Sequence, residues 1–300
     1  MTWEIVTEAR YGRHFAIDGE SFRLDGAEFR VLSGALHYFR VRPEQWAHRL
    51  RTLRAMGLNT VETYVPWNLH EPRPGEMRRL EELDAFLAEA ARADLLAIVR
   101  PGPYICAGWD NGGLPSWLTG ALGRRVRTRA PGYLARVDRF FDALIPLVAR
   151  HQVTRGGNVI MVQVENECGS YGSDRVYLRH LADGLVARGV EVPLFTSGGP
   201  EDHMLTGGSI PGVLATVKFG SDPEEAFAVL RRHRPGEPLL CMEFWNGWFD
   251  RWGRGHVTRD PVDAAVSESP TSAAAAPVFV SFPIVVSLSV TRAPAGVRCR

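Results

Sequence analysis

Long apolar runs and an excess of one charge are both missing from this 300-residue sequence. No stretch of about 18 apolar residues occurs, so a membrane-spanning helix is not expected. The 35 Lys and Arg residues are balanced by 34 Asp and Glu residues, which leaves a formal net charge of +1. Nucleic acid and anionic membranes are therefore not expected as partners, because both attract strongly basic proteins. The sequence does not indicate an oligomeric state.

Clustered metal ligands and closely spaced cysteines are also missing. The nine His residues form no H-E-x-x-H motif or other metal-ligand spacing, so no metal or organic cofactor is expected. No C-x-x-C motif occurs among the four Cys residues, which are Cys106, Cys168, Cys241 and Cys299. These widely spaced cysteines are expected to be free thiols, which indicates a reducing compartment. The first ten residues carry acidic side chains where a signal peptide needs a basic and then an apolar segment, so a cytoplasmic location is expected.

The sequence does contain a regular alternation of short apolar runs and amphipathic stretches, and its hydrophobic share of 45% is enough for a large core. Buried strands are predicted over residues 28–35, 58–65, 95–99, 159–164, 193–196, 213–219 and 238–243. Helices are predicted over residues 43–57, 79–93, 133–150, 174–188 and 223–232. Turns at Asp18-Gly19 and Asp25-Gly26 predict a short antiparallel unit over residues 14–30.

Seven strands that alternate with helices predict a parallel α/β fold. No G-x-G-x-x-G motif follows the first strand, and no internal repeat occurs. These observations disfavour a dinucleotide-binding sheet and favour an eight-stranded (β/α)8 TIM barrel.

The residues after 260 break this pattern. Between residues 264 and 291 the only charged side chain is Glu268, and Ala, Ser, Pro and Val dominate. Residues 277–290 are apolar enough for a strand, but Pro283 interrupts them. Two interpretations are an unusual final strand and a disordered or misencoded terminus, and the second is preferred. We therefore expect a barrel over residues 1–260 that lacks its eighth strand, followed by an atypical tail over residues 261–300.

Two carboxylates stand at the ends of predicted strands. Glu167 follows the fourth strand in N-V-I-M-V-Q-V-E-N-E, and Glu243 ends the seventh in P-L-L-C-M-E-F-W. In a closed barrel the two positions face each other across the mouth, where such folds bind ligands. Two carboxyl groups there indicate glycoside cleavage, with retention for a pair about 5 Å apart and inversion for a wider pair. Glu165 shares the strand parity of Glu167, so spacing alone leaves open which of the two is the acid.

Polar and aromatic neighbours of this pair fit a sugar site. Asn166 is placed to hold a sugar hydroxyl, and Trp245 is placed to offer a flat apolar wall. His37, His70 and Glu71 are interpreted as structural residues at the barrel rim.

Six motifs in a fixed order make the sequence resemble a known family. They are S-G-A-L-H-Y-F-R (33–40), N-T-V-E-T-Y-V-P-W-N-L-H-E-P (59–72), R-P-G-P-Y-I-C-A (100–107), G-G-L-P-S-W-L (112–118), Q-V-E-N-E (163–167) and E-F-W-N-G-W-F-D (243–250). Over about residues 12–258 the sequence closely resembles the family 35 glycoside hydrolases, the β-galactosidases. The resemblance implies a (β/α)8 barrel followed by β-sandwich domains, and retaining hydrolysis of terminal non-reducing β-D-galactosyl residues in β-galactosides.

The resemblance also implies roles for individual residues. Glu167 would be the acid/base and Glu243 the nucleophile of a double displacement, which selects Glu167 over Glu165. The implied substrate contacts are Tyr64, Ile105, Cys106, Ala107, Asn166 and Trp245. The glycoside hydrolase barrel would occupy residues 1–260, with the β-sandwich domains missing.

The sequence departs from the family pattern at several places. Gly108 stands where the family usually has a sugar-binding Glu, Cys168 where Tyr is common, and Trp245 where many relatives have Tyr. The Gly-Gly-Thr-Asn-type motif of the family's eighth strand is not found. Two alternatives therefore stay open: a catalytically impaired galactoside-binding remnant, and a related β-glycosidase such as an exo-β-glucosaminidase.

Overall fold

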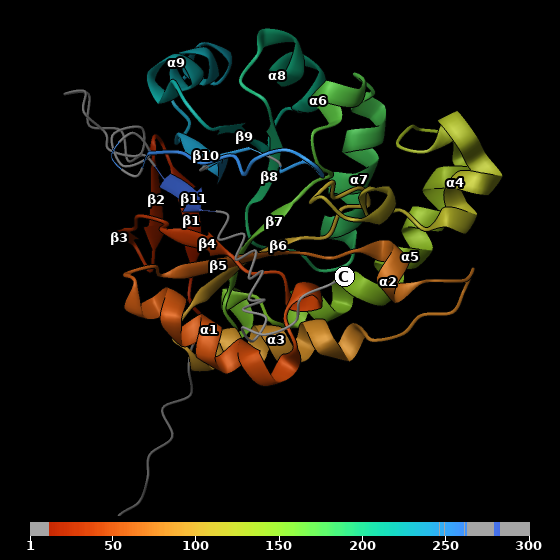
Figure 1. Cartoon of the computed structure of the whole chain (residues 1–300), viewed down its shortest axis with the longest axis horizontal. Coiled ribbons are helices and arrows are strands. Elements are labelled where there is room, and N and C mark those ends of the chain that lie inside the picture. The colour runs from red at the N-terminus through yellow and green to blue at the C-terminus, as the bar shows by residue number, and fades with distance from the viewer. Residues whose placement is uncertain (1–11, 246, 249, 261, 263–278, 283–300) are drawn as a thin grey trace, which may run out of the picture.

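Eight parallel strands close into a barrel at the centre of the protein (Figure 1). The computed structural model describes residues 12–245, 247–248, 250–260, 262 and 279–282. The barrel strands are β4 Ser33–Ala35, β5 Thr60–Tyr64, β6 Leu96–Arg100, β7 Val159–Gln163, β8 Leu194–Gly198, β9 Leu214–Phe219, β10 Leu240–Phe244 and β11 Phe279–Phe282. They neighbour one another in this sequence order, and β11 pairs with β4 to close the ring.

Helices surround the barrel as an outer layer (Figure 1). The α-helices are α1 Pro43–Ala55, α2 Trp67–His70, α3 Leu80–Arg92, α4 Ser116–Leu122, α5 Pro131–Arg150, α6 Cys168–Tyr171, α7 Arg175–Ala187, α8 Asp202–Gly208 and α9 Pro223–His233. Short 3-10 helices are η1 Tyr38–Arg40, η2 Asp110–Gly113, η3 Gly123–Arg125 and η4 Val153–Arg155. Every residue of β5, β7 and β9 is buried, as expected for parallel strands that are covered on both faces. No helix of the described residues is long and apolar enough to cross a membrane.

Local sequence explains where the long helices begin and which face they bury. Pro43 lies in the first turn of α1, where its missing N–H costs no helical hydrogen bond. Trp46, Leu50 and Leu53 follow at helical spacing and form the buried face of α1. Asp174 caps α7, because its carboxylate accepts a hydrogen bond from the backbone N–H of Tyr177 at 3.1 Å.

A three-stranded antiparallel sheet precedes the barrel, as the turn motifs predicted. Its strands are β1 Phe15–Asp18, β2 Ser21–Leu24 and β3 Ala27–Glu28. Phe15 and Phe22 stack with their ring centroids 5.5 Å apart, and both belong to the large hydrophobic core. The backbone N–H of Arg13 donates to the carbonyl of Val153 at 2.8 Å. This contact attaches the small sheet near the beginning of β7, at the opposite end of the barrel from the carboxyl ends of the strands.

The eighth strand corrects one prediction. A barrel without this strand is what the sequence predicts, but β11 lies between β10 and β4 in the closed barrel. In register, Leu240 faces Phe279 and Ser33 faces Ser281. The described strand comprises the four residues that precede Pro283 in the sequence. The expectation for the rest of the tail concerns residues 263–278 and 283–300, which lie outside the described residues.

The other predicted elements are found, with ends that differ by a few residues. The first predicted strand, over residues 28–35, is the exception, because only Ser33–Ala35 belongs to the barrel as β4. Four short helices were not predicted, namely α2, α4, α6 and α8. Each has four to seven residues, which is too short for helical periodicity to be visible in the sequence.

Candidate active site

Glu167 leaves the barrel just after β7. Its backbone has a φ of 53°, in the left-handed region that non-glycine residues rarely adopt. Its N–H donates to the carbonyl of Ser197 in β8 at 2.9 Å, which fixes the turn against the neighbouring strand. Such backbone is common where a side chain must be held for function. The turn holds the Glu167 carboxylate at the barrel mouth, where 26% of the side chain is exposed.

Glu243 approaches from the other side of the mouth. It lies within β10, one residue before the end of the strand. The pairing of β10 with β9 shifts register between Cys241 and Glu243, and irregularities of this kind re-aim side chains. The side chain of Glu243 is 19% exposed.

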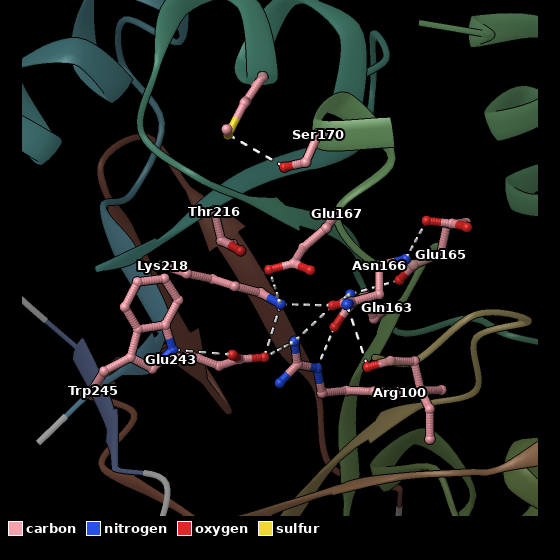
Figure 2. Close-up of polar contacts among 12 residues, drawn as sticks. Arg100, Gln163, Glu165, Asn166, Glu167, Ser170, Thr216, Lys218, Glu243 and Trp245 are labelled. Carbon is pink, nitrogen blue, oxygen red and sulfur yellow. Dashed lines mark hydrogen bonds and ion pairs between the residues drawn. The ribbon is translucent and has the colours of Figure 1, made fainter. Parts of the chain in front are cut away.

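Lys218 joins the two carboxylates (Figure 2). It belongs to β9 and pairs in register with Glu243. Its Nζ lies 2.8 Å from Glu243 Oε1 and 3.4 Å from Glu167 Oε1. Because both contacts share one nitrogen atom, the two Oε1 atoms lie at most about 6 Å apart, a separation at which two carboxyl groups reach the same sugar carbon.

Hydrogen-bond donors surround Oε1 of Glu243. Lys218 Nζ and Arg100 Nη2 each lie 2.8 Å away, and the Tyr64 hydroxyl lies 2.6 Å away. Arg100 is fully buried and also pairs with Glu62 at 3.1 Å. Burial raises the pKa of Glu243, but the Lys218 and Arg100 cations outweigh burial and hold this pKa well below its ordinary value. Glu243 is therefore ionised at neutral pH.

Glu165, the alternative to Glu167, points away from the pair (Figure 2). Its two oxygens accept hydrogen bonds from Arg127 at 2.8 and 3.0 Å, and the Tyr177 hydroxyl lies 3.3 Å from Oε1. The Glu165 side chain is completely buried. A two-pronged contact with a buried guanidinium fixes the orientation of a carboxylate. Glu165 thus faces Arg127, whereas the Glu167 carboxylate faces Lys218.

Tyr64 and Asn166 lie beside the pair, but their polar atoms form hydrogen bonds with other protein groups. The Tyr64 hydroxyl lies between Glu243 Oε1 and Asn166 Oδ1, 3.0 Å from the latter. Asn166 Oδ1 also accepts from Lys218 Nζ at 2.7 Å, and its Nδ2 donates to the carbonyl of Ile105 at 3.3 Å. Both residues therefore hold the carboxylates and the lysine in place. Their contacts with a sugar stay a prediction.

The segment after β6 carries the other implied substrate contacts. Cys106 and Ala107 have φ values of 57° and 51°, so two successive residues turn in the left-handed region. Ile105 is buried, and its N–H donates to the carbonyl of Gly112 at 2.8 Å. The carbonyl of Ala107 accepts from the Arg40 guanidinium. This loop is thus held by its own backbone groups near the mouth, and its contacts with a sugar also stay a prediction.

A cavity of about 780 Å³ opens beside Glu167. Glu167, Lys218 and Trp245 line it, and most of the remaining wall comes from the segments that follow β8 and β9. Trp245 Nε1 lies 3.4 Å from Glu243 Oε2, and its ring meets Trp248 edge to face with centroids 5.6 Å apart. Trp245 therefore combines an apolar cavity wall with a contact to the carboxylate pair.

Sequence reasoning missed Lys218 and Arg100. Lys218 is the only lysine in the sequence, and it stands inside a strand pattern whose other residues are apolar except for Thr216. Arg100 ends another such pattern. A charge in a buried strand is costly unless it is paired, so these two positions carried a signal that a partner lay nearby.

His37, which the sequence analysis treated as a rim residue, also lies close to the pair. Its ring centroid is 5.4 Å from that of Tyr64. Its buried Nδ1 has no hydrogen-bond partner among the described residues. Burial, together with the Arg40 and Arg100 charges, lowers the pKa of His37 to about 3, so the ring is neutral at physiological pH.

Neither a metal site nor a disulfide accompanies these groups in the described part of the chain. No group of three or more His, Cys, Asp or Glu side chains there is arranged to hold a metal ion. Cys106, Cys168 and Cys241 are free thiols, and Cys299 lies outside the described residues.

The fold is similar to that of several solved structures. The exo-beta-1,4-mannosidase from Opitutaceae bacterium strain TAV5 aligns with a TM-score of 0.62 over 76% of this chain and 48% of its own, at 18% identity. A Streptomyces cattleya protein solved in complex with GlcNAc aligns with a TM-score of 0.57 over 73% of this chain and 62% of its own, at 15% identity. At such low identity these likenesses concern the fold alone.

Sequence relatives are much more similar. The beta-galactosidase-1-like protein of Mus musculus is 47% identical over 255 residues, which cover 82% of this chain and 39% of that protein. The beta-galactosidase of Xanthomonas manihotis is 43% identical over 250 residues, which cover 82% of this chain and 42% of that protein. The chain thus spans about two fifths of the length of these relatives. Residues 21–275 match the family described as Glycosyl hydrolases family 35. Because this match covers most of the chain, the protein belongs to glycosyl hydrolase family 35.

Proposed function

We propose that this chain hydrolyses terminal non-reducing β-D-galactosyl residues of β-galactosides with retention, by a double displacement that uses Glu243 and Glu167. The observation that carries the proposal is the carboxylate pair whose Oε1 atoms lie 2.8 and 3.4 Å from Lys218 Nζ. The resulting upper limit of about 6 Å is close to the spacing of about 5 Å in retaining pairs, whereas inverting pairs are wider to admit a water molecule.

In the first half-reaction Glu243 is the nucleophile. Its Oε1 already accepts from Lys218, Arg100 and Tyr64, whereas the contact of Oε2 among the described residues is the longer one to Trp245 Nε1 at 3.4 Å. We therefore assign the attack on the anomeric carbon to Oε2. The bond from Oε2 to this carbon forms as the glycosidic bond breaks, and Glu167 gives its proton to the departing oxygen.

In the second half-reaction Glu167 acts as the base. It takes a proton from a water molecule whose oxygen bonds to the anomeric carbon, while the electron pair of the breaking ester bond returns to Glu243. Glu167 is more exposed than Glu243 and lines the cavity of about 780 Å³. The leaving group and the incoming water are therefore assigned to this cavity, because both exchange a proton with Glu167.

The galactosyl preference rests on relatives and motifs. Mus musculus and Xanthomonas manihotis proteins named as a beta-galactosidase-1-like protein and a beta-galactosidase are 47% and 43% identical to this chain. The implied sugar contacts are those of the family pattern: Tyr64, Ile105, Cys106, Ala107, Asn166 and Trp245. A panel of nitrophenyl glycosides tests this choice, since faster turnover of the glucosaminide than of the galactoside would favour the related β-glycosidase.

One variant and the stereochemistry of the product test the mechanism. Glu243→Gln should lower turnover of a nitrophenyl β-galactoside by at least about 1,000-fold while leaving the unfolding midpoint close to that of the parent, because the nucleophile is lost and the shape is kept. Proton NMR of a fresh reaction should show β-galactose before its α anomer. An initial α anomer, or a Glu243→Gln variant as fast as the parent, contradicts the proposal.

The alternative of a galactoside-binding remnant rested on Gly108 and on the expected loss of the eighth strand. The second reason no longer holds, because β11 closes the barrel. Calorimetry with galactose beside a turnover assay separates the two proposals. Binding without turnover would favour the remnant.

We also propose a cytoplasmic location. The free thiols of Cys106, Cys168 and Cys241 are compatible with a reducing compartment. Fractionation of the native organism followed by a galactosidase assay tests this location, and activity confined to the medium or to an oxidising compartment contradicts it.

A further inference from the structure

Lys218 is a buried cation in contact with both carboxyl groups. It is the only lysine in the sequence, and its side chain is 1% exposed inside the barrel. Its Nζ contacts three acceptors: Glu243 Oε1 at 2.8 Å, Asn166 Oδ1 at 2.7 Å and Glu167 Oε1 at 3.4 Å (Figure 2). A buried ammonium is stable only with a close counter-charge, and the acidic groups that contact Nζ are the two candidate catalytic carboxyl groups.

The double displacement moves one negative charge between these two carboxylates. Before the first step Glu243 is ionised and Glu167 carries the proton. After it, Glu243 is a neutral ester, and Glu167 has given up its proton and is the anion. The water reaction reverses both changes. One of the two carboxylates is thus charged at each stage, while the total charge of the pair stays the same.

We propose that Lys218 is the shared counter-ion of this charge, pairing with Glu243 in the free enzyme and with Glu167 in the glycosyl–enzyme. This inference rests on the proposed retaining mechanism and makes Lys218 a positioning residue that acts through the two glutamates. The contact to Glu243 is shorter than the contact to Glu167, as the free enzyme with an ionised Glu243 requires. A shift of less than an ångström at the end of a flexible side chain reverses this preference.

Arg100 does not share this ability. Its Nη2 pairs with Glu243 at 2.8 Å, but its Nη1 is committed to Glu62 at 3.1 Å. Its Nε binds Gln163, and the side chain is fully buried. Among the described residues, Lys218 is the cation with contacts to both carboxylates. A single ammonium on a flexible stem suits a charge that changes place, whereas a guanidinium with several fixed partners does not.

The proposal predicts which half-reaction suffers when the charge is removed. With Lys218→Met, nothing compensates the Glu167 anion in the glycosyl–enzyme, so Glu167 keeps its proton and is a poor base for water. The first step can be made independent of Glu167 by a dinitrophenyl galactoside, whose leaving group needs no proton. On this substrate we expect Lys218→Met to lower turnover about 100-fold, the loss of a general base, with accumulation of glycosyl–enzyme.

Azide distinguishes this role from a structural one. Azide attacks the anomeric carbon without a base, so it should raise turnover of Lys218→Met at least about tenfold and yield β-galactosyl azide. The matched control is Tyr64→Phe, which removes a donor from Glu243 Oε1 and has no contact with Glu167. Tyr64→Phe should lose turnover without any response to azide, and Lys218→Arg should retain more turnover than Lys218→Met. A Lys218→Met variant that folds, is slow and ignores azide overturns the proposal.

A second measurement needs no substrate, because the chain has one lysine. Lysine labelled with ¹⁵N at Nζ gives a single ammonium signal. We expect Glu243→Gln and Glu167→Gln each to shift this signal, since each alters one of the two carboxyl groups that Nζ contacts. The control is Glu201→Gln, which removes a charge from the same cavity without contact to Lys218 and should leave the signal in place. A signal that responds to Glu243→Gln and ignores Glu167→Gln overturns the shared role.

The two measurements also separate this proposal from the proposed function. If the parent turns over no aryl galactoside or other aryl glycoside, the proposed function fails. The ammonium signal still decides whether Lys218 serves both carboxylates in that case. If the parent is active but azide and the ammonium signal give the contrary results, the hydrolase stands and the shared counter-ion falls.

Discussion

At the scale of single residues, Gly108 is the clearest departure from the family pattern. It follows Ala107 at the barrel mouth, and its carbonyl accepts from Arg40 Nη2 at 3.1 Å. A Cβ added to Gly108 would have its nearest heavy atom 3.9 Å away, so a longer side chain has room. The backbone φ of +54° is the remaining obstacle, because side chains raise the energy of this conformation.

We expect Gly108→Glu to improve galactose binding. A carboxylate that accepts sugar hydroxyls contributes about 1–3 kcal/mol, which corresponds to a KM lower by one to two decades. Gly108→Ala is the matched control, since it meets the same backbone cost without adding an acceptor. Steady-state kinetics on nitrophenyl β-galactoside measures both. Equal KM values for the two variants would show that no sugar hydroxyl lies within reach of this position.

Glu165 illustrates how a residue of the right type and parity serves structure instead. Its ion pair with Arg127 is buried on both sides, and Arg127 also stacks on the ring of Tyr104 at 3.8 Å. We expect Glu165→Gln to lower the free energy of unfolding by about 3–5 kcal/mol, because it leaves a buried guanidinium without its counter-charge. Urea unfolding measures this loss. The exposed Arg54–Asp94 pair is the control, and Asp94→Asn should change little.

At the scale of secondary-structure elements, closure of the barrel depends on a four-residue strand. β11 Phe279–Phe282 pairs with β10 on one side and β4 on the other. We expect Ser281→Pro to lower the free energy of unfolding by at least about 1–3 kcal/mol, because proline removes an N–H and leaves a partner carbonyl unpaired. Ser281→Ala keeps the N–H and is the control. Equal midpoints for the two variants in urea would contradict the pairing of β11.

The elements also show what the sequence could and could not predict. The strand β7 was the easiest to predict because its nearly continuous apolar run is buried on both faces. β11 was missed because the regular β/α alternation stops before it, and Pro283 argued against a strand. β11 lies between β10 and β4, and this position follows from closure of the barrel and not from the local residues.

Prediction of the candidate active site from the sequence has the same limit, because some of its residues are recognisable only from contacts between distant segments. Glu167 and Glu243 could be chosen as candidates because Glu167 follows β7 and Glu243 lies near the end of β10, and strand order brings the carboxyl ends together. Glu165 could not be separated from Glu167 by spacing, because its role depends on Arg127, which is 38 residues earlier in the chain. Lys218 was overlooked because its partners lie in β10 and in the turn after β7, so its role depends on contacts between segments that are far apart in the sequence.

At the scale of the whole molecule, the lowered pKa of the His37 ring makes stability depend on pH. The pKa of His37 is about 3 in the folded protein and about 6.5 in the unfolded chain, so the unfolded chain takes up the proton first as the pH falls. The contribution of this pKa difference to the free energy of unfolding is therefore complete above pH 6.5 and is lost as the pH falls toward 3. The free energy of unfolding changes by at most about 1.4 kcal/mol per pH unit, and the partial exposure of His37 reduces this change.

We expect His37→Phe to weaken this acid sensitivity. Phenylalanine keeps the stacking on Phe39, whose ring centroid lies 5.4 Å from that of His37, and has no proton to bind. Urea midpoints of parent and variant at pH 7, 5.5 and 4.5 measure the difference. Parallel falls in the two proteins would show that other groups cause the acid sensitivity.

The most direct test of the central claim is the identity of the residue that becomes glycosylated. A 2-deoxy-2-fluoro-β-galactosyl fluoride slows the second half-reaction more than the first and traps the covalent intermediate. Peptide mass mapping should then find one adduct, on Glu243, and none in the Glu243→Gln variant. An adduct on Glu165 or Glu167, or turnover with inversion and no adduct, would contradict the retaining mechanism across this pair.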